Sequence, residues 1–473
     1  MTQFNHPYRH LVQITLEAVA PLRIGSGEKG IKTDALVIRD VNGLPFIPGT
    51  TLAGLIGHAL PAGRKELMGD QTEGSRLILT EAKLLDRNGN AIDGLADISD
   101  PEDKAFLELF ERLPIRQHVR IGHRGTAEKA GKFDEEVVLK GSRFCFEMEL
   151  MASQDATDDI EILLGILQSP VFRIGSGSRS GFGEIKVVQC LHKSLCLNEK
   201  ADLDLYLLKS SKIGETWDGW EKHPLDGQDS DSRWIAYRLS LKPEDFILFG
   251  SGFGDAKGYS DITYVQESVI KWVNNLATIV SQDQTVLIPG ASIKGALAHR
   301  TAYHYNRLTG SVIMENGELS NGKDRNEVIG NRNPAIKSIF GSEGDRNELD
   351  GKLKKRRGNI LISDVILAAG AGSGPKVLNH VSIDRFTGGA IDGALFQEQT
   401  FYAKGETFDI DFLVANDAFP VGDENIRKAF EAALEDVATG MLPLGGGVNR
   451  GNGVFTGTVE TFNKEKKQWE RLA

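Results

Sequence analysis

Hydrophobic and polar residues alternate at the start of the chain and then change their spacing. From Arg9 to Leu22 most apolar residues stand at every second position, which predicts a strand because successive side chains of a strand point to opposite faces. From residue 50 to 59 apolar residues recur three and four positions apart, as they do along one face of a helix. The same reasoning predicts strands at 35–38, 76–84, 137–150 and 184–189 and a helix near 158–168.

The second half of the chain shows a similar succession. Strands are predicted at 358–368 and 406–414, and a helix at 424–439 carries its apolar residues on one face. A strand, a helix, two strands, a helix and a final strand make the ferredoxin-like order. RRM domains share this layout and bind RNA on the sheet. The pattern therefore predicts an α+β protein built from ferredoxin-like, RRM-like domains.

Six segments of the first half recur in the same order in the second half. The distance between matching segments grows along the chain, as expected for duplicated domains with different loop insertions. The matching pairs are 25–27 with 250–252, 32–34 with 259–261, 47–58 with 288–299, 77–81 with 361–364, 118–121 with 380–383, and 174–183 with 444–453. We therefore expect a first domain at 1–192, a linker at 193–232 in which Trp217 and Trp220 are candidate anchors, and a second domain at 233–473.

Composition places the chain among ordinary globular proteins, with 40% hydrophobic and 26% charged residues. The net charge of −11 argues against unspecific coating by nucleic acid, although basic patches at 112–124, 294–307 and 352–357 allow local RNA contacts. The three cysteines form no Cys-x-x-Cys pair, so neither a zinc site nor a disulfide framework is expected. No apolar run approaches the roughly 20 residues of a membrane span. With no signal peptide visible, we expect a cytoplasmic location and no membrane partner.

Two helices are expected to begin at equivalent Pro-Gly turns. Thr50 or Thr51 would cap the first helix and Ser292 the second, after Gly49 and Gly290. A helix N-terminus presents free amide groups and a partial positive charge, so it binds a phosphate readily. Because the turn occurs in both halves beside a glycine loop, we favour a phosphate site over a plain capping turn.

The 53 glycines are clustered, most densely in the loops 174–183 and 444–453. The first loop resembles a dinucleotide fingerprint, but a strand at 184–188 follows it where that fingerprint needs a helix. We expect both loops to lie against a nucleic-acid backbone, with Arg179 and Arg450 as charged partners; a tight structural bend is the alternative. The sequence contains no phosphate-binding Walker loop, serine hydrolase motif or zinc protease motif.

Asp34 and Asp261 are the candidate catalytic residues, because each follows a Gly-Ser-Gly turn at the same place in its repeat. A loop carboxylate beside an RNA backbone can coordinate Mg²⁺, or accept the proton of a 2′-hydroxyl as it attacks the adjacent phosphate. The alternative is a solvated aspartate or a local turn cap. Asp40 and Asp255 are nearby rivals.

Together these segments resemble the RAMP superfamily of CRISPR effector proteins, and more narrowly the repeated backbone subunit of type III complexes. The resemblance rests on Gly25–Gly27 with Thr33–Asp34, Pro45–Gly54, Asn379–Leu395 and Gly445–Gly451, and on the block from Gly250 to Gly295. It covers most of both halves but not the linker. Two fused copies resemble the backbone subunits of type III-D-like systems.

The resemblance implies two tandem ferredoxin-like RAMP domains with inserted thumb hairpins, roughly at 120–137 and 384–400. It implies a guide RNA, a complementary target RNA and other type III effector subunits as partners. It also implies target cleavage by Asp34 and Asp261 with a divalent cation such as Mg²⁺. The residues expected to bind RNA are Ser26, Lys32, Gly49, Thr50, Thr51, Arg120, Arg124, Gly177, Arg179, Ser251, Gly290, Ser292, Lys294, Arg300, Arg385, Gly446, Gly447 and Arg450.

Two other functions stay open at this point. A non-catalytic scaffold would make the same guide contacts without cleavage. A guide-processing nuclease of the same superfamily would rely on a loop histidine as general base. His58 and His299 stand at equivalent positions, but on predicted helices, which favours a core or RNA-facing role for them. The domains also differ at one helix position, where Ala53 corresponds to Lys294.

Overall fold

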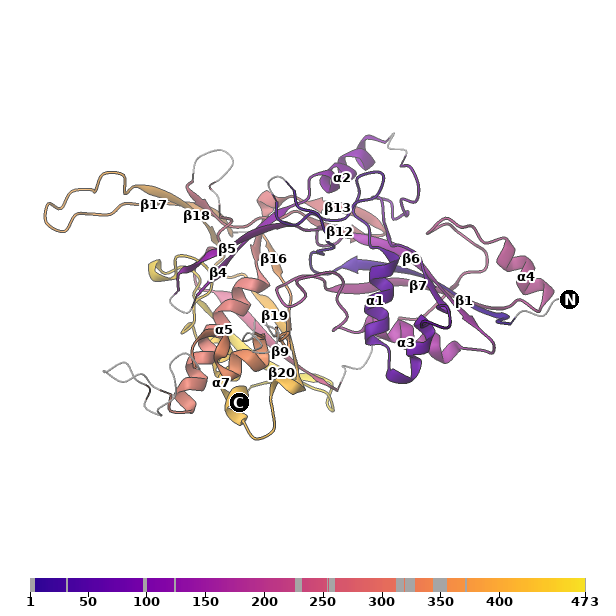
Figure 1. Cartoon of the computed structure of the whole chain (residues 1–473). Helices are drawn as coiled ribbons and strands as arrows, with labels where there is room; N and C mark the ends of the chain where they lie inside the picture. Colours follow the sequence, from indigo (N-terminus) through magenta and orange to yellow (C-terminus); the bar gives the residue numbers. More distant parts are fainter. Residues whose placement is uncertain are drawn as a thin grey trace.

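The computed structural model describes residues 5–472 apart from several segments, and contains two α+β domains (Figure 1). The segments outside the description are 31–32, 97–99, 123–124, 226–231, 253, 255–259, 312–318, 320–327, 343–354 and 371. No helix in the described part is long and apolar enough to cross a lipid bilayer. The predicted fold class is confirmed.

The first domain is built on a sheet whose central strand is β1 (Tyr8–Ala18). Its antiparallel neighbours are β6 (Arg143–Ala152) and β7 (Ile185–Cys196), and the sheet order is β2-β6-β1-β7-β8. The remaining strands of this sheet are β2 (Leu77–Leu79), β3 (Lys83–Leu84) and β8 (Glu221–Lys222). Helices α1 (Gly49–Ala59) and α3 (Thr157–Gln168) pack their apolar faces into the same core as β1 and β6.

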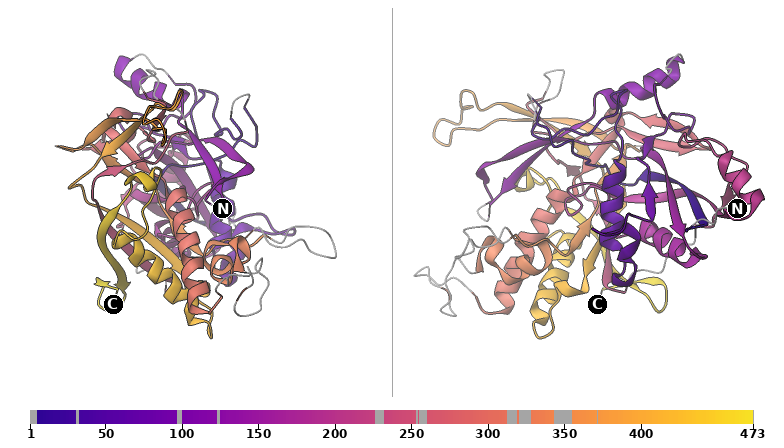
Figure 2. Two further views of the ribbon diagram at one scale, coloured as in Figure 1. Left: turned by 90° about the vertical axis from the view of Figure 1, so that its left-hand side faces the viewer. Right: turned by 45° about the vertical axis from the view of Figure 1, so that its right-hand side comes forward.

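The second domain repeats this plan with the order β15-β19-β9-β20-β21. Its strands are β9 (Trp234–Pro243), β15 (Ile360–Ile362), β19 (Phe408–Ala415), β20 (Phe455–Asn463) and β21 (Gln468–Arg471). Helices α5 (Gly290–Leu308) and α7 (Glu424–Ala438) lie side by side against the sheet (Figures 1 and 2). In both domains the first strand is central in its sheet; β1 is buried on both faces, whereas buried residues of β9 alternate with partly exposed ones.

Three hairpins leave these sheets. β4 (Ile115–Ile121) and β5 (Ala127–Glu136) form thumb one, and β17 (Gly374–His380) and β18 (Phe396–Tyr402) form thumb two. Thumb two projects from one end of the molecule (Figure 1). β12 (Val269–Val273) and β13 (Leu276–Val280) form a third hairpin, which belongs to the second domain in sequence but packs on the first.

The remaining elements are short connections. They are α2 (Pro101–Glu111), α4 (Lys200–Leu207), β10 (Phe246–Ile247), β11 (Ile262–Thr263), β14 (Thr285–Ile288) and β16 (Val365–Ala368). Residues 35–38, predicted as a strand, make isolated bridges from Ala35 to Glu135 and from Val37 to Gly25. The predicted strand at 137–150 is in fact divided, because β6 begins at Arg143 after the turn at Gly141.

The segment predicted as a linker packs largely on the first domain. β7 continues past the expected boundary to Cys196, and α4 follows it. Trp217 and Trp220 lie edge to face and join Leu11, Leu195 and Leu197 in a small apolar cluster. The described part of the segment therefore belongs structurally to the first sheet.

Candidate nucleic-acid interface

Asp34 is exposed and is held against the second strand of thumb one. The Asp34 backbone N–H donates to Oδ1 of Asp134 at 2.9 Å, and the Asp134 N–H donates to Oδ2 of Asp34 at 3.2 Å. One residue further, Ala35 pairs in parallel with Glu135. The loop thus pairs with the edge of β5, and this pairing fixes the position of the Asp34 backbone.

Asp261 has a similar arrangement in the second domain, except that its N–H bonds a backbone carbonyl instead of a carboxylate. Its N–H donates to the Gln397 carbonyl at 2.9 Å, and the Gln397 N–H donates to Oδ2 of Asp261 at 2.8 Å. β11 then runs parallel to β18, pairing Ile262 with Glu398. Both candidate aspartates are therefore exposed at the base of a thumb, and each carboxylate accepts a thumb amide.

A buried glutamate lies one residue beyond each of these contacts. In thumb one, Glu135 is 1% exposed; its Oε2 lies 2.6 Å from Nη1 of Arg23 and its Oε1 lies 3.1 Å from Nε2 of His118. The His118 ring stacks on Phe133, with 4.9 Å between centroids. The Arg23 guanidinium and the His118 imidazole together stabilise the Glu135 carboxylate, which is shielded from water.

Thumb two repeats the cluster with different cations. Glu398 is fully buried and is bonded to Arg450 and Asn452, and its Oε1 lies 3.8 Å from Nε2 of His380. His380 stacks on Phe396 at 4.8 Å. Sequence reasoning paired the two histidines but assigned the glutamates no role. The matching Phe and Glu, two residues apart in both thumbs, were the signal that could have found this cluster.

The base of thumb one reaches into the second domain through Arg116. This guanidinium is 4% exposed, pairs with Asp364, and donates from Nη2 to Oε2 of Glu267 at 2.7 Å. It also lies 5.0 Å from the Phe182 ring. Burial opposes its charge, but Asp364 and Glu267 raise the pKa of Arg116 above its ordinary value. The junction between the domains is thus held by a buried triad of one cation and two carboxylates.

The helix N-termini are used within the protein rather than capped by hydroxyls. Pro48 and Pro289 stand at the N-caps, and neither helix has a side-chain cap hydrogen bond. The predicted caps at Thr50, Thr51 and Ser292 are therefore wrong, because these residues already lie in the first helical turn. The Gly290 amide donates to Oδ1 of Asp364 at 2.7 Å, and Gly290 is buried against Gly181. A side chain at Gly49 would likewise collide with the carbonyls of residues 79 and 80.

Positive charge gathers where the first glycine loop meets α5. Arg179 Nε donates to the Gly358 carbonyl at 2.9 Å. Burial, with the neighbouring Arg357 and Arg173, lowers the pKa of Arg179 to about 10. Burial, with Arg179 beside it, also lowers the pKa of Lys294. Burial is the larger cause of both shifts and the neighbouring cations add to it, so a bound anion would offset the crowding of positive charge here.

Other residues predicted to bind RNA are placed at varied sites. Arg450 is engaged by Glu398, Arg300 by Asp436 and Arg120 by Glu128, while Arg385 is exposed on thumb two. The Ser26 hydroxyl donates to the Leu36 carbonyl at 3.3 Å. Lys32, Arg124 and Asp255 lie outside the described residues.

Of the predicted serine and glycine contacts, Ser251 and Gly446 are bonded to distant backbone carbonyls and Gly177 and Gly447 take left-handed conformations, while the two histidines lie outside the core. The N–H of Ser251 donates to the Thr263 carbonyl at 2.8 Å and that of Gly446 donates to the Leu248 carbonyl at 2.6 Å. Gly177 and Gly447 have positive φ values of 75° and 66°. Both His58 and His299 are exposed on their helices.

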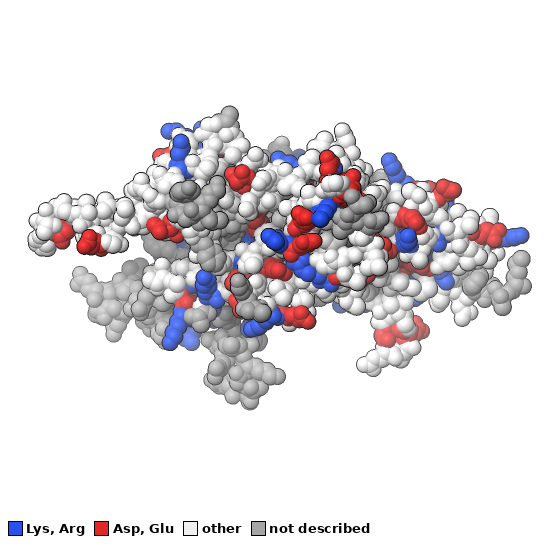
Figure 3. Space-filling model, turned by 90° about the horizontal axis from the view of Figure 1, so that it is seen from above, with Lys and Arg blue, Asp and Glu red and all other residues white. Residues whose placement is uncertain are grey.

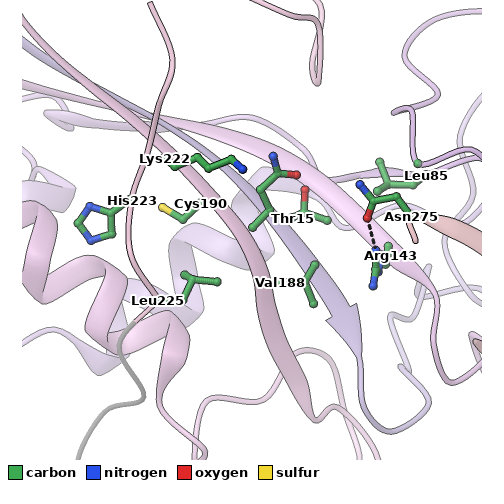
Figure 4. Close-up of a pocket in the computed structure, with 11 residues that line it drawn as sticks. Thr15, Leu85, Arg143, Val188, Cys190, Lys222, His223, Leu225 and Asn275 are labelled. Atoms are coloured by element: carbon green, nitrogen blue, oxygen red, sulfur yellow. Dashed lines mark hydrogen bonds between the residues drawn. The ribbon is translucent and has the colours of Figure 1, made fainter. Parts of the chain in front are cut away.

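The surface and the pockets add little to this site. Seen from above, basic and acidic side chains are interspersed in the described surface (Figure 3). A pocket of about 350 Å³ lies between β1, β7 and the third hairpin, where Arg143 Nη1 donates to Asn275 Oδ1 at 3.4 Å (Figure 4). Burial raises the pKa of its Cys190 thiol to about 12, so this cysteine is not a thiolate nucleophile at neutral pH.

A divalent cation was expected at Asp34 and Asp261. Among the described residues, no group of three or more His, Cys, Asp or Glu side chains is placed to enclose a metal ion. At Asp34 a second carboxylate, Asp134, is adjacent, and such an oxygen pair suits Mg²⁺, which commonly uses one or two carboxylates together with substrate phosphates. Gln397 takes the place of Asp134 beside Asp261, so the donor set there is poorer.

Comparison with known proteins agrees with the internal repeat. The sequence profile of the RAMP superfamily matches residues 15–186 and again 270–456. A search of curated proteins gives no match. Among solved structures, a chain from "Type III-B Cmr-beta Cryo-EM structure of the Apo state" aligns with 37% of this chain and 96% of its own length, at 14% identity and a TM-score of 0.29. Because the profile matches well over half of the sequence, in two regions, this chain belongs to the RAMP superfamily.

Proposed function

We propose that the chain is a backbone subunit of a type III CRISPR effector, which binds a guide RNA and cleaves a complementary target RNA. The observation that carries the proposal is the repeated placement of Asp34 and Asp261. Each is exposed, and each is anchored by a thumb amide at the same register. Two equivalent loops at a fixed separation suit a repeating RNA strand better than a single small substrate.

The guide would be held through its phosphates at the junction between domains. Arg179 and Lys294 come from different domains, and Arg179 lies close enough to lower the pKa of Lys294. A phosphate placed between them would relieve this repulsion, and it would carry no base information. The guide, rather than the protein, would therefore select the target.

The proposed chemistry is attack of a target 2′-hydroxyl on the adjacent phosphate. The bond from phosphorus to the 5′-oxygen breaks, which leaves a 2′,3′-cyclic phosphate and a 5′-hydroxyl that takes its proton from water. Asp34 would accept the hydroxyl proton in the first domain, and Asp261 would do so in the second. A divalent cation held by Asp34 and Asp134 would stabilise charge on the phosphate. The exposed position of both carboxylates leaves them accessible to a strand lying along the thumb bases.

The test is cleavage of a labelled target by the complex assembled with its guide. Asp34→Asn and Asp261→Asn retain an oxygen that can accept the thumb amide, so each should abolish one cut and leave target binding unchanged. Asp40→Asn is a matched control, since Asp40 caps its own turn by accepting the Asn42 N–H at 2.9 Å. Persistence of both cuts in the double variant would refute the assignment.

A non-catalytic scaffold is the second candidate. Each aspartate carboxylate already accepts an amide, so a purely structural role as a thumb anchor accounts for the same contacts. A scaffold would bind target with unchanged affinity and leave it intact whether or not Mg²⁺ is supplied. Metal-dependent cuts that vanish in the Asn variants distinguish the two functions.

A further inference from the structure

The two domains exchange structural elements across their junction. The first domain sends Arg116, at the base of thumb one, between Glu267 and Asp364 of the second. The second domain sends back its β12–β13 hairpin, whose Ile270 and Ala277 enter the core of the first. The contact is head to tail, so each domain uses a different surface.

The hairpin rests on a tight turn of the first domain, at residues 140–143. The Ile270 N–H donates to the Lys140 carbonyl at 3.0 Å, and Trp272 Nε1 donates to the Gly141 carbonyl at 2.7 Å. The Arg143 guanidinium lies 4.2 Å from the Trp272 ring. Gly141 has a φ of 86°, and any side chain there would collide with the Ile270 carbonyl.

The second domain has the same turn at residues 404–407, where no described hairpin covers it and only the Glu406 side chain lies against Gly370. The Ser142 N–H donates to the Leu139 carbonyl at 3.2 Å, and the Glu406 N–H donates to the Ala403 carbonyl at 3.1 Å, so the two turns are equivalent. Gly405 has a φ of 95°, but a side chain there would meet no described atom within 4 Å. Gly141 is buried and Gly405 is exposed.

Thumb two lacks its receptor as well. Its position equivalent to Arg116 is Leu378, since Arg116 pairs with Glu135 across thumb one and Leu378 pairs with Glu398 across thumb two. The hairpin projects away from both domains (Figure 1). Within the described residues, neither half of the exchange is occupied at this end of the molecule.

A second copy of this chain does not fit that end. In the first domain the receptor positions are Glu81 and Asp40. Glu81 precedes Ala82, which pairs with Ile47 as Val365 pairs with Ile288; Asp40 lies two residues after Ile38, whose N–H donates to the Ile24 carbonyl as that of Val265 donates to the Phe249 carbonyl. Docking Leu378 there would press an apolar side chain against Asp40 and the ion pair of Glu81 with Lys83, and would dehydrate these charges without bonding them. The first domain also has only the turn at Asp40–Gly43 in place of a long hairpin.

We propose that the second-domain end of this chain docks a RAMP domain from a different polypeptide, which supplies a long hairpin to residues 404–407 and an apolar receptor to Leu378. The chain therefore does not extend by stacking on itself, because heterologous contacts propagate only where the two surfaces are complementary. The proposal rests on the proposed function, in that it assumes a complex of several such subunits.

The first test is a photo-cross-linker, benzoylphenylalanine, at the exposed Thr407 of the full chain, in the complex isolated from its source cells through a tag on this chain. Cross-links to a RAMP-domain polypeptide other than this chain support the proposal. Cross-links to a second copy of the chain or to RNA alone, or none, overturn it.

The second test uses Leu378→Arg, with Val377→Arg on the opposite face of the same strand as the matched control. Leu378→Arg should reduce recovery of the cross-linked partner roughly tenfold or more, while Val377→Arg leaves it nearly unchanged. Equal recovery in both overturns the proposal. In the Asp34→Asn, Asp261→Asn chain the cross-link should persist while the cuts vanish. A wild-type complex that gives the cross-link but does not cut its target would refute the proposed cleavage and leave the docking proposal standing.

Discussion

The two thumbs share their strands, their stacked histidine and their buried glutamate, yet they differ at the base. Thumb one is fixed to the second domain by Arg116, between two buried carboxylates. Thumb two has the half-buried Leu378 at that position and projects free of both domains. The duplicated fold has therefore kept the features around each candidate cleavage loop and changed the contact with the neighbouring domain.

Residues that are common to both thumbs and residues that differ between them therefore have separate roles. The shared set, with Asp34 and Asp261 at its edge, is positioned by bonds within one domain. The residues that differ, Arg116 and Leu378, determine which surface each thumb can pack against. An internal junction tolerates a buried ion pair because both partners are supplied by one chain, whereas an outer surface must remain soluble until its partner arrives.

The largest expected effect comes from removing the cation of the triad. Arg116→Met should lower the free energy of unfolding by about 3–5 kcal/mol, because it leaves Glu267 and Asp364 buried without a counter-charge. Leu378→Met, the same residue introduced in thumb two, should cost less than about 1.5 kcal/mol. Denaturant unfolding of both variants measures the contrast, and equal losses would contradict it.

The effect on cleavage sharpens the same comparison. Arg116→Met should weaken the cut assigned to Asp34 more than the cut assigned to Asp261, since only thumb one loses its anchor. The measurement is the ratio of the two target fragments made by the complex. A parallel loss of both fragments would mean that the triad stabilises the whole chain rather than positioning one thumb.

The two equivalent turns give the next effect. Gly141→Ala and Gly405→Ala both force alanine into the left-handed region, at about 1–2 kcal/mol. Gly141→Ala also collides with the Ile270 carbonyl, which adds about 1–3 kcal/mol. Thermal unfolding should therefore separate the two variants clearly. Similar melting temperatures would show that the hairpin does not press on the first domain.

The smallest effect concerns guide binding. Lys294→Met should reduce the salt dependence of guide affinity by about 0.7 in the logarithmic slope, as for loss of one phosphate contact on a single strand. Because burial lowers the pKa of Lys294, the wild-type affinity should fall as the pH rises through that lowered pKa, and the variant should lose this dependence. Ala53→Met, at the equivalent first-domain position, should change neither quantity.

Much of the architecture could be predicted from the sequence because it is written in local patterns that occur twice. Alternating residues identified the central strand near Arg9, and helical spacing identified α1 and α7. The repeated turns located Asp34 and Asp261 at equivalent positions, and the structure places both beside a thumb. The hydroxyl caps failed because a proline at the N-cap moves the following residues into the helix.

The sequence by itself determined that the chain contains two copies of one α+β domain with an aspartate loop in each, since periodicity and repetition depend only on residue order. Tertiary structure alone decided how the copies meet. Arg116 lies 151 residues from Glu267 and 248 from Asp364, and no local pattern links residues so far apart. A lone arginine or a lone glycine has no distinguishing mark in sequence, because its role arises only when folding removes water and brings the other domain's carboxylates or backbone against it.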